Sequence, residues 1–380
     1  MNKGTLSSVF ILSLCILSFR AAWGAPEAQT LRLIESEPSV QSWMAPEEIL
    51  QLSLKNHENS QRCPGFLDVT DYPKPAEILS SVQLLKSLGQ VPGGPGSEPS
   101  HHATVEKLIS EVEFERMRST VSDLSSFHNR YYQSDTGVQA SEWIKNRFTE
   151  YAGARTDISV EFFSHPRFRQ PSVIARMRGE GPHADEVVVI GGHLDSITRP
   201  TSGRAPGADD NASGISTVLE VFRVLAQSGY RPERTLEFMG YAGEEVGLLG
   251  SQEISRNYRA SDKKVIGAMQ FDMTMFPGNG KPITLISDNV DPALTQYVEK
   301  LIDTYVRVPW VASACGYGCS DHASWTRAGY ASVFPFEAPF EEYNHKIHTP
   351  NDVLAILDPE FGSLFAKVGL AYAIEMAGER

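Results

Sequence analysis

The chain has 380 residues, 41% of them hydrophobic, which is enough to bury a large core with one accessory segment. Its formal net charge of -13 argues against nucleic acid or an anionic membrane as a partner. An acidic balance is otherwise ordinary for a soluble surface. Composition therefore excludes two classes of partner and selects no function.

The first 24 residues have the pattern of a secretory signal peptide. Lys3 supplies a basic start, residues 9–17 are apolar, and Ala22-Trp23-Gly24 forms a small-x-small cleavage site. The apolar run is shorter than the ~20 residues that a membrane-spanning helix needs. A lipoprotein signal is the alternative, since Cys15 lies in that run, but the bulky Leu14 before it disfavours lipidation. We therefore expect secretion to the extracellular space, with the periplasm in transit, and no stable membrane association.

Residues 25–100 differ in character from the rest of the chain. Two short helical patterns, at 46–54 and 75–88, are followed by a Gly/Pro-rich run at 89–99. Such a run is typical of an exposed, protease-sensitive linker. The segment is either a small N-terminal domain on a tether or a pro-segment that covers a site until it is cut away. The main domain is expected at 101–380.

The four cysteines fit this division. Cys15 leaves with the signal peptide and Cys63 lies in the segment 25–100, so Cys315 and Cys319 remain. In a chain bound for an oxidising compartment, this pair predicts a disulfide. Zinc binding is the alternative, but no second Cys or His pair with finger-like spacing accompanies it. Because a loop this short gains little stability from a cross-link, the bond is expected to fix the shape of the turn at 316–318.

From residue 104 onward, helical and strand patterns alternate, which predicts an α/β sandwich with a largely parallel sheet. The run at 187–190 is apolar without alternation, as a central strand buried on both faces should be. Several strands are followed directly by an acidic or histidine residue, at the edge where open α/β sheets bind ligands. Helices are expected at 106–127, 141–151, from 213, after 245, 293–306 and 361–376, and strands at 159–163, 172–177, 187–190, 235–239, 265–271, 282–286 and 331–336.

Two of these strand ends carry candidate metal ligands. His193 follows the strand at 187–190, and Asp195 stands where it could fix the tautomer of that imidazole. A hydrogen-bonded loop histidine is an equally ordinary interpretation. Asp209 and Asp210 could simply cap the next helix, but two carboxylates beside a buried strand end are costly without a cation.

The pair Glu244-Glu245 lies between apolar residues, which favours burial over a solvated helix surface. Adjacent glutamates on a loop point in different directions, so one can bind a metal while its neighbour moves a proton. Asp272 lies in an apolar strand, where it is hard to justify unless it is paired or bound. For a second imidazole ligand, spacing does not choose among His322, His345 and His348. The sequence contains no Gly-x-Ser-x-Gly elbow, and no free cysteine remains for nucleophilic catalysis.

Five motifs now stand in order: Gly-His-Leu-Asp-Ser, Pro-Gly-Ala-Asp-Asp-Asn-Ala-Ser-Gly, Ala-Gly-Glu-Glu-Val-Gly-Leu-Leu-Gly-Ser, Gln-Phe-Asp-Met and Ile-His-Thr. Together they resemble the M28 family of zinc aminopeptidases, and are most similar to the secreted bacterial leucyl aminopeptidases of the Aeromonas/Vibrio type. The resemblance covers roughly residues 105–378. It implies a three-layer α/β/α sandwich around a mixed, mostly parallel sheet. For a secreted hydrolase, delayed activation favours a pro-segment at 25–100.

The resemblance also assigns roles to the candidate residues. It implies two Zn²⁺ per chain, with Asp210 bridging them. It chooses His348 over the other two histidines, places Glu244 as the general base and Asp195 as the support of His193, and pairs Cys315 with Cys319. It further implies a cis peptide between Asp210 and Asn211. The remaining ligands are His193 and Asp272 for one ion, and Glu245 and His348 for the other.

This set of residues implies a hydrolytic mechanism. Three carboxylates among five ligands offset most of the four positive charges of two Zn²⁺, and the remaining charge favours a bound hydroxide. Two ions about 3.5–4 Å apart can polarise a scissile carbonyl and generate that nucleophile at neutral pH. Glu244 would take the proton and pass it to the leaving amine. Tyr317, on the turn shaped by the disulfide, would donate to the developing oxyanion.

The expected substrate is a peptide or protein with a free N-terminus, because its α-amine would lie against a metal and an acidic wall. The expected side-chain pocket contains a cluster of aromatic residues, and core packing would explain any one of them equally well. Together, these residues favour a substrate with a bulky apolar first residue such as Leu, Phe or Met. We expect a monomer that also binds its own pro-segment. A single-zinc acyltransferase resembling glutaminyl cyclases and a catalytically inactive, receptor-like domain are the rival hypotheses. By resemblance the side-chain pocket comprises Met273, Ile286, Phe334, Phe336, Phe340, Tyr343 and Ile347.

Overall fold

The computed structural model describes residues 1, 31–37, 40–60, 65–70 and 97–380. The signal peptide at 1–24, the helix expected at 75–88, most of the linker and Cys63 therefore lie outside the described residues, Met1 apart. Within the described ranges, no helix is both long enough and apolar enough to cross a membrane.

A six-stranded mixed sheet forms the centre of the main domain, in the order β11-β8-β6-β7-β5-β4. Its central strand β6 (Glu186–His193) runs parallel to both β7 (Thr235–Tyr241) and β8 (Lys264–Gln270). β11 (Ser332–Val333) extends this parallel part. On the other side, β5 (Ser172–Met177) pairs antiparallel with β7, and β4 (Ile158–Phe163) pairs antiparallel with β5. The apolar residues 187–190 of β6 are at most 2% exposed, which confirms the prediction of a strand buried on both faces.

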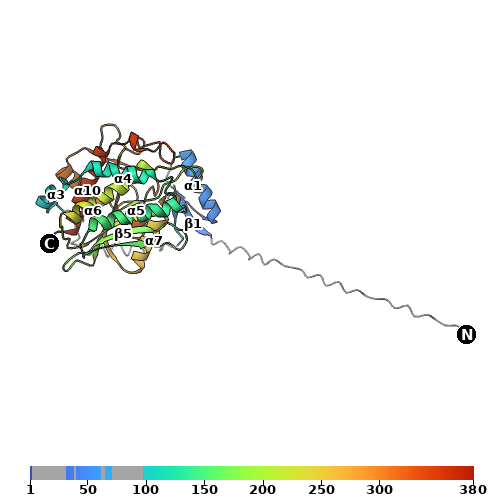
Figure 1. The fold of residues 1–380 in the computed structure, drawn as a ribbon, viewed down its shortest axis with the longest axis horizontal. Coiled ribbons are helices and arrows are strands. Elements are labelled where there is room, and N and C mark those ends of the chain that lie inside the picture. The colour runs from blue at the N-terminus through green and yellow to red at the C-terminus, as the bar shows by residue number, and fades with distance from the viewer. Residues whose placement is uncertain (2–30, 38–39, 61–64, 71–96) are drawn as a thin grey trace.

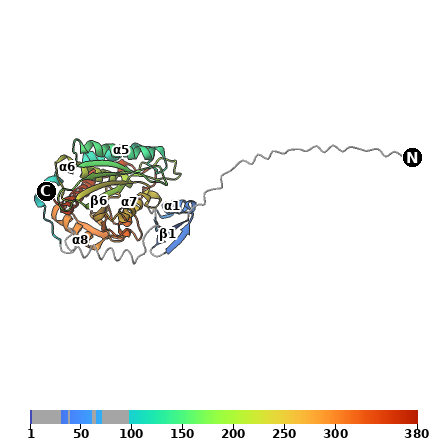
Figure 2. The same cartoon turned by 90° about the horizontal axis from the view of Figure 1, so that it is seen from below.

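Helices cover both faces of this sheet and complete the three layers (Figures 1 and 2). One face packs on α4 (Phe114–Ser126), α5 (Asp135–Ala152), α6 (Gly214–Gln227) and α10 (Pro359–Ala377). The other face packs on α7 (Leu249–Ala260) and α9 (His322–Arg327). The predicted α/β/α sandwich is therefore confirmed. α8 (Pro292–Leu301), which packs against α10, continues into the π-turn η3 (Ile302–Val306).

Two expected elements are divided in the structure. The helix expected at 106–127 is split into α3 (His102–Ile109) and α4. Side chains of α6 hold the backbone at the break: Glu220 accepts from the N–H of Glu113, and Arg223 donates to the carbonyl of Glu111. The helical bonds are replaced there by these contacts.

The strand expected at 331–336 is also divided, because it serves two sheets. β11 belongs to the central sheet, whereas β12 (Pro335–Phe336) pairs with β9 (Ile283–Ile286) in a small sheet of order β10-β9-β12. β10 is Trp310–Ser313. The chain therefore crosses from one sheet to the other at Phe334, whose carbonyl accepts from the N–H of Ile286.

The described part of the N-terminal segment forms a separate antiparallel sheet, β2-β1-β3, beside one helix. Its strands are β1 (Arg32–Glu37), β2 (Val40–Met44) and β3 (Leu67–Asp68), and its helix α1 (Pro46–Ser60) contains the helical pattern expected at 46–54. Figures 1 and 2 show this unit at the end of the main domain away from the C-terminus. Leu67 and Val69 of this unit share a buried apolar cluster with Leu248 and Ala323 of the main domain, so the unit packs against that domain.

Candidate active site

The fold brings five predicted ligands to one edge of the central sheet. His193 is the last residue of β6, and Asp272 follows the end of β8. Asp210 lies in the π-turn η1 (Ala208–Ser213), Glu245 in the 3-10 turn η2 (Glu244–Val246) after β7, and His348 in the loop after β12. The parallel strands end at the same edge, which is why residues far apart in sequence meet there.

The five side chains form two groups that share Asp210. His193 Nε2 lies 3.0 Å from Asp210 Oδ1 and 3.3 Å from Asp272 Oδ1. His348 Nε2 lies 2.9 Å from Asp210 Oδ2 and 3.2 Å from Glu245 Oε2. Each oxygen of Asp210 therefore faces a different histidine, as a carboxylate that bridges two cations would.

These residues fit zinc. Imidazole nitrogen and carboxylate oxygen are donors that zinc accepts, and with tetrahedral bonds of about 2.0 Å the donor atoms stand about 3.3 Å apart. The separations of 2.9 to 3.3 Å match that spacing. Hydrogen bonding explains the arrangement less well, because one imidazole N–H can be aligned well with only one of its two carboxylate neighbours.

The buried carboxylates and imidazoles of the site shift the pKa values of one another. Burial raises the pKa of Glu245 to about 7. The neighbouring Asp210 also raises this pKa, whereas His348 lowers it. Against the effect of burial, Glu245 and Asp210 raise the pKa of His348 to about 10. Protons held by these groups supply positive charge that a metal would displace on binding.

Glu244 and Asp195 complete this centre, and both are fully buried. Glu244 Oε2 lies 4.0 Å from His193 Nε2, close to the ligands but outside both groups. Burial raises the pKa of Glu244 far above its usual range. Nearby carboxylates, of which Asp321 contributes most, raise this pKa further, whereas His193 lowers it. Asp195 Oδ1 lies 3.6 Å from His193 Nδ1, which is the side expected for its support of that imidazole.

An apolar pocket opens beside the ligands. All but one of the predicted pocket residues line it; the exception is Ile286, which is buried in the same apolar cluster beneath the surface. Tyr317 and the two ligands Asp210 and Asp272 form part of the lining, so the pocket is continuous with the candidate metal centre. Its apolar lining is Met273, Cys319, Phe334, Phe336, Phe340, Tyr343 and Ile347, with Tyr317.

A family model described as peptidase family M28 matches residues 172–373, more than half of the chain. A protein of Arthroderma otae named "Probable leucine aminopeptidase" is 37% identical over 372 residues, which cover 97% of this chain and 98% of that protein. The chain belongs to peptidase family M28. It is a metallo-aminopeptidase, and so a hydrolase.

Solved structures agree with this assignment. The LapA aminopeptidase of Legionella pneumophila superposes with a TM-score of 0.79 and 29% identity, over 93% of this chain and 100% of the other. BSAP, a zinc aminopeptidase of Bacillus subtilis, has a TM-score of 0.60 at 15% identity, over 71% of this chain and 96% of the other. At that identity the second likeness establishes the fold alone.

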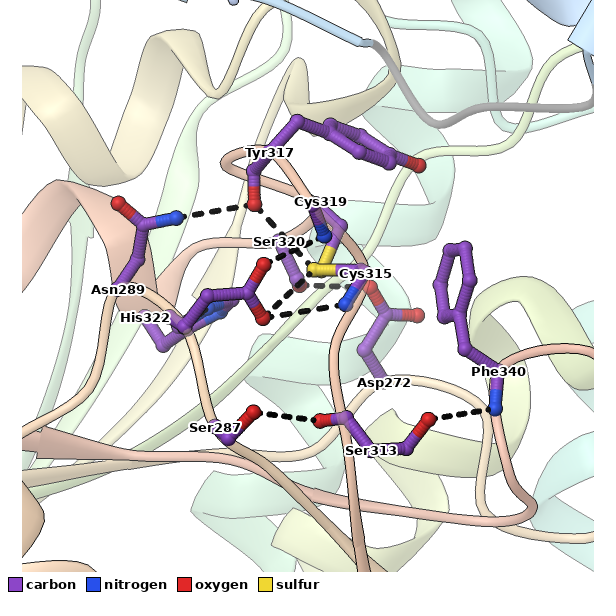
Figure 3. Close-up of a disulfide and its surroundings, with 12 residues drawn as sticks. Asp272, Ser287, Asn289, Ser313, Cys315, Tyr317, Cys319, Ser320, His322 and Phe340 are labelled. Atoms are coloured by element: carbon purple, nitrogen blue, oxygen red, sulfur yellow. Dashed lines mark hydrogen bonds between the residues drawn. A yellow bond between two sulfur atoms is a disulfide. The ribbon is translucent and has the colours of Figure 1, made fainter. Parts of the chain in front are cut away.

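The disulfide turn of this M28 aminopeptidase lies against one of the ligands (Figure 3). Cys315 and Cys319 are bonded, as predicted. Ser320, the next residue, donates from its hydroxyl to Asp272 Oδ2 at 2.6 Å. The turn thereby connects the pocket wall to the candidate metal centre, and sequence reasoning gave no reason to select Ser320.

The other two candidate histidines lie outside both ligand groups. The His322 ring packs 4.8 Å from the ring of Phe334, and burial lowers its pKa to about 3. The ring of His345 lies 4.7 Å from that of Tyr343. The preference for His348 therefore agrees with the geometry.

Asp352 is a further residue that sequence reasoning missed. Its carboxylate accepts from the backbone N–H groups of Asp209, at 3.0 Å, and Asp210, at 3.1 Å, and from Asn344 Nδ2 at 3.2 Å. It thereby ties the turn that carries Asp210 to the loop that carries His348. The peptide between Asp210 and Asn211 is cis, as the resemblance implied.

Proposed function

We propose that this M28 aminopeptidase is a secreted enzyme with two zinc ions that removes N-terminal residues, preferably bulky apolar ones such as Leu, from peptides and proteins. The observation that carries the proposal is the pair of ligand groups that share the two oxygens of Asp210. Zinc bound there would polarise the scissile carbonyl and lower the pKa of the attacking water.

Glu244 is the proposed general base. It takes a proton from the attacking water and passes it to the amine that leaves, a role that fits a buried carboxylate 4.0 Å from His193 Nε2 and outside both ligand groups. Asp195 holds its backbone in place, accepting from the N–H of Glu244 at 3.0 Å and of Glu245 at 3.3 Å. Tyr317 is placed in the pocket wall, and its hydroxyl is proposed to donate to the developing oxyanion.

Specificity follows from the two surroundings of the substrate's first residue. Its α-amine lies against the carboxylate-rich centre, and its side chain enters the pocket formed by residues such as Phe334, Phe336 and Tyr343. Burial of a Leu side chain contributes roughly 1.5–3 kcal/mol. That amount accounts for a preference for bulky apolar residues over small ones.

The experiment compares hydrolysis of Leu-p-nitroanilide with that of its N-acetylated form, with and without a chelator. We expect cleavage of the free-amine substrate only, loss of activity on chelation, recovery with Zn²⁺, and two zinc ions per chain by elemental analysis. Equal cleavage of both substrates would contradict exopeptidase action. One ion per chain, with cyclisation of N-terminal Gln in place of Leu release, would support the single-zinc acyltransferase.

The segment 25–100 is proposed to be a pro-segment, because its described part contacts the turns that flank the site. Ser53 Oγ donates to the carbonyl of Glu245 at 3.0 Å. Phe66 packs so closely on Gly247 that a Cβ there would lie 2.6 Å from the ring. A Cβ at Gly318 of the disulfide turn would likewise lie 3.0 Å from the side chain of Leu67.

Removal of the pro-segment is expected to change activity. We expect the enzyme recovered from culture medium to begin within or after the linker at 89–99, and limited proteolysis of the full chain at this linker to raise the rate of Leu release. A mature N-terminus near residue 25 would contradict the proposal. Sedimentation of both forms would test the expected monomer.

A further inference from the structure

The turn that carries Glu244 adjoins a series of hydrogen bonds between a serine, a histidine and a glutamate. Ser172 Oγ lies 2.8 Å from His165 Nε2, and His165 Nδ1 lies 2.9 Å from Glu253 Oε2. These are the contacts of a hydrolytic triad. Ser172 is fully buried within β5, however, and its hydroxyl oxygen already accepts from the N–H of Ala242 at 3.0 Å. No substrate can reach it, so the series cannot supply a nucleophile.

We propose instead that His165, oriented by Glu253, is a positioning residue for the general base, acting through Ser172 and Ala242. The inference rests on the proposed function, in which Glu244 is that base. Ala242 lies two residues before Glu244, at the point where the chain leaves β7. Two side chains thus hold the backbone of this turn. Asp195 accepts from the N–H groups of Glu244 and Glu245, and Ser172 accepts from that of Ala242.

The glutamate decides the direction of each hydrogen bond in the series. A carboxylate can only accept, so Glu253 selects the tautomer of His165 that carries its proton on Nδ1. The unprotonated Nε2 then accepts the single hydroxyl proton of Ser172. With its proton so directed, the Ser172 oxygen presents a lone pair to the N–H of Ala242.

Packing constrains the histidine and the serine of the series, while Glu253 stays partly exposed. The side chain of His165 is completely buried, and its ring stacks on Phe168 with 4.4 Å between centroids. Glu253 comes from α7, one turn after Gly250. A Cβ at Gly250 would lie 2.4 Å from the carbonyl oxygen of Ala242 and 2.9 Å from Ser172 Oγ. The start of α7 is therefore fitted to this hydrogen-bonded series, which fixes strand, turn and helix together.

The test uses the full chain loaded with zinc and four variants. Ser172→Ala removes the acceptor for Ala242, and His165→Phe keeps a stacking ring without its nitrogens. Both are expected to lower kcat for Leu-p-nitroanilide by about 10- to 100-fold, since a misplaced catalytic group can lose about 100-fold. KM and zinc content should change less than about twofold. Hydrogen exchange of the backbone amides of residues 242–245 should be faster in both variants than in the wild type, with zinc bound and also in the metal-free protein.

The two Glu253 variants separate positioning from bulk stability. Glu253→Gln keeps an oxygen that accepts from the Nδ1–H of His165 and should retain nearly all activity. Glu253→Leu removes this acceptor and should lower kcat, as His165→Phe does. They also keep the inference testable if a buried variant fails to fold. The matched control is His183→Phe, because His183 forms an exposed pair with Glu186 at 3.2 Å; it should match the wild type.

Unchanged kcat in Ser172→Ala and Glu253→Leu, with only a lower melting temperature, would overturn the inference. So would equal losses in Glu253→Gln and Glu253→Leu. Failure of the proposed function has a different signature, since Glu244→Gln would then remain active whatever the four variants do.

Discussion

The candidate metal centre and the apolar pocket beside it are built in opposite ways. Each ligand of the centre comes from a different strand end or loop, and further buried polar groups hold the ligands in place. The apolar lining comes mainly from one stretch of the chain, residues 334–347, and its members contact one another through their rings.

Because of this difference, the two regions are expected to tolerate substitutions unequally. A buried charge has few acceptable partners, so one substitution in the centre leaves other groups uncompensated. In the pocket, neighbouring rings such as those of Phe336 and Phe340, 6.1 Å apart, can partly compensate for a lost neighbour. We therefore expect all-or-none effects in the centre and graded effects in the pocket.

The largest expected effect is that of Glu244→Gln. The amide cannot take up a proton, so kcat should fall by about 10²–10⁴-fold, while KM and zinc content stay close to those of the wild type. Steady-state kinetics with elemental analysis check this. As a control, Glu115→Gln makes the same chemical change in an exposed glutamate of α4 and should leave kcat unchanged. A Glu244→Gln enzyme with more than about a tenth of normal kcat would remove this residue as the base.

A smaller, graded effect is expected from Phe340→Ala at the partly buried wall of the pocket. Loss of the ring should reduce kcat/KM for Leu-p-nitroanilide by about 10-fold and leave the value for Ala-p-nitroanilide nearly unchanged, because pocket contacts are worth about 1–3 kcal/mol. The ratio of the two substrates is the measurement. Equal losses for both would place Phe340 outside the specificity pocket.

The contrast also explains what the sequence could predict. A carboxylate beside an apolar strand is expensive to bury, so Asp272 and the pairs Asp209-Asp210 and Glu244-Glu245 were recognisable from their surroundings. The resemblance decided which member of each pair binds metal. The α/β fold followed from alternating apolar patterns. Residue patterns alone did not choose His348, because it lies in a loop; the resemblance supplied that choice.

Other features left no trace in residue patterns. Asp352 and Ser172 act by accepting from backbone N–H groups of distant segments, and every residue but proline offers such a group. Their partners therefore carry no characteristic residue type. The division of the strand at Phe334 depends on which of two sheets each half joins, which is likewise a property of the assembled fold.

The smallest effect on activity is expected from His322→Gln, and its consequence concerns stability. Burial against Phe334 lowers the pKa of His322 to about 3, whereas the unfolded chain has the usual value of about 6.5. The folded protein therefore keeps this imidazole neutral while the unfolded chain takes up a proton, and the free energy of unfolding decreases as pH falls from about 6.5 towards 3. The decrease is about 1.4 kcal/mol per pH unit at most. Urea unfolding at several pH values should show a shallower decrease for His322→Gln, with kcat unchanged at neutral pH; parallel curves would contradict the neutral, buried state of His322 beneath the pocket.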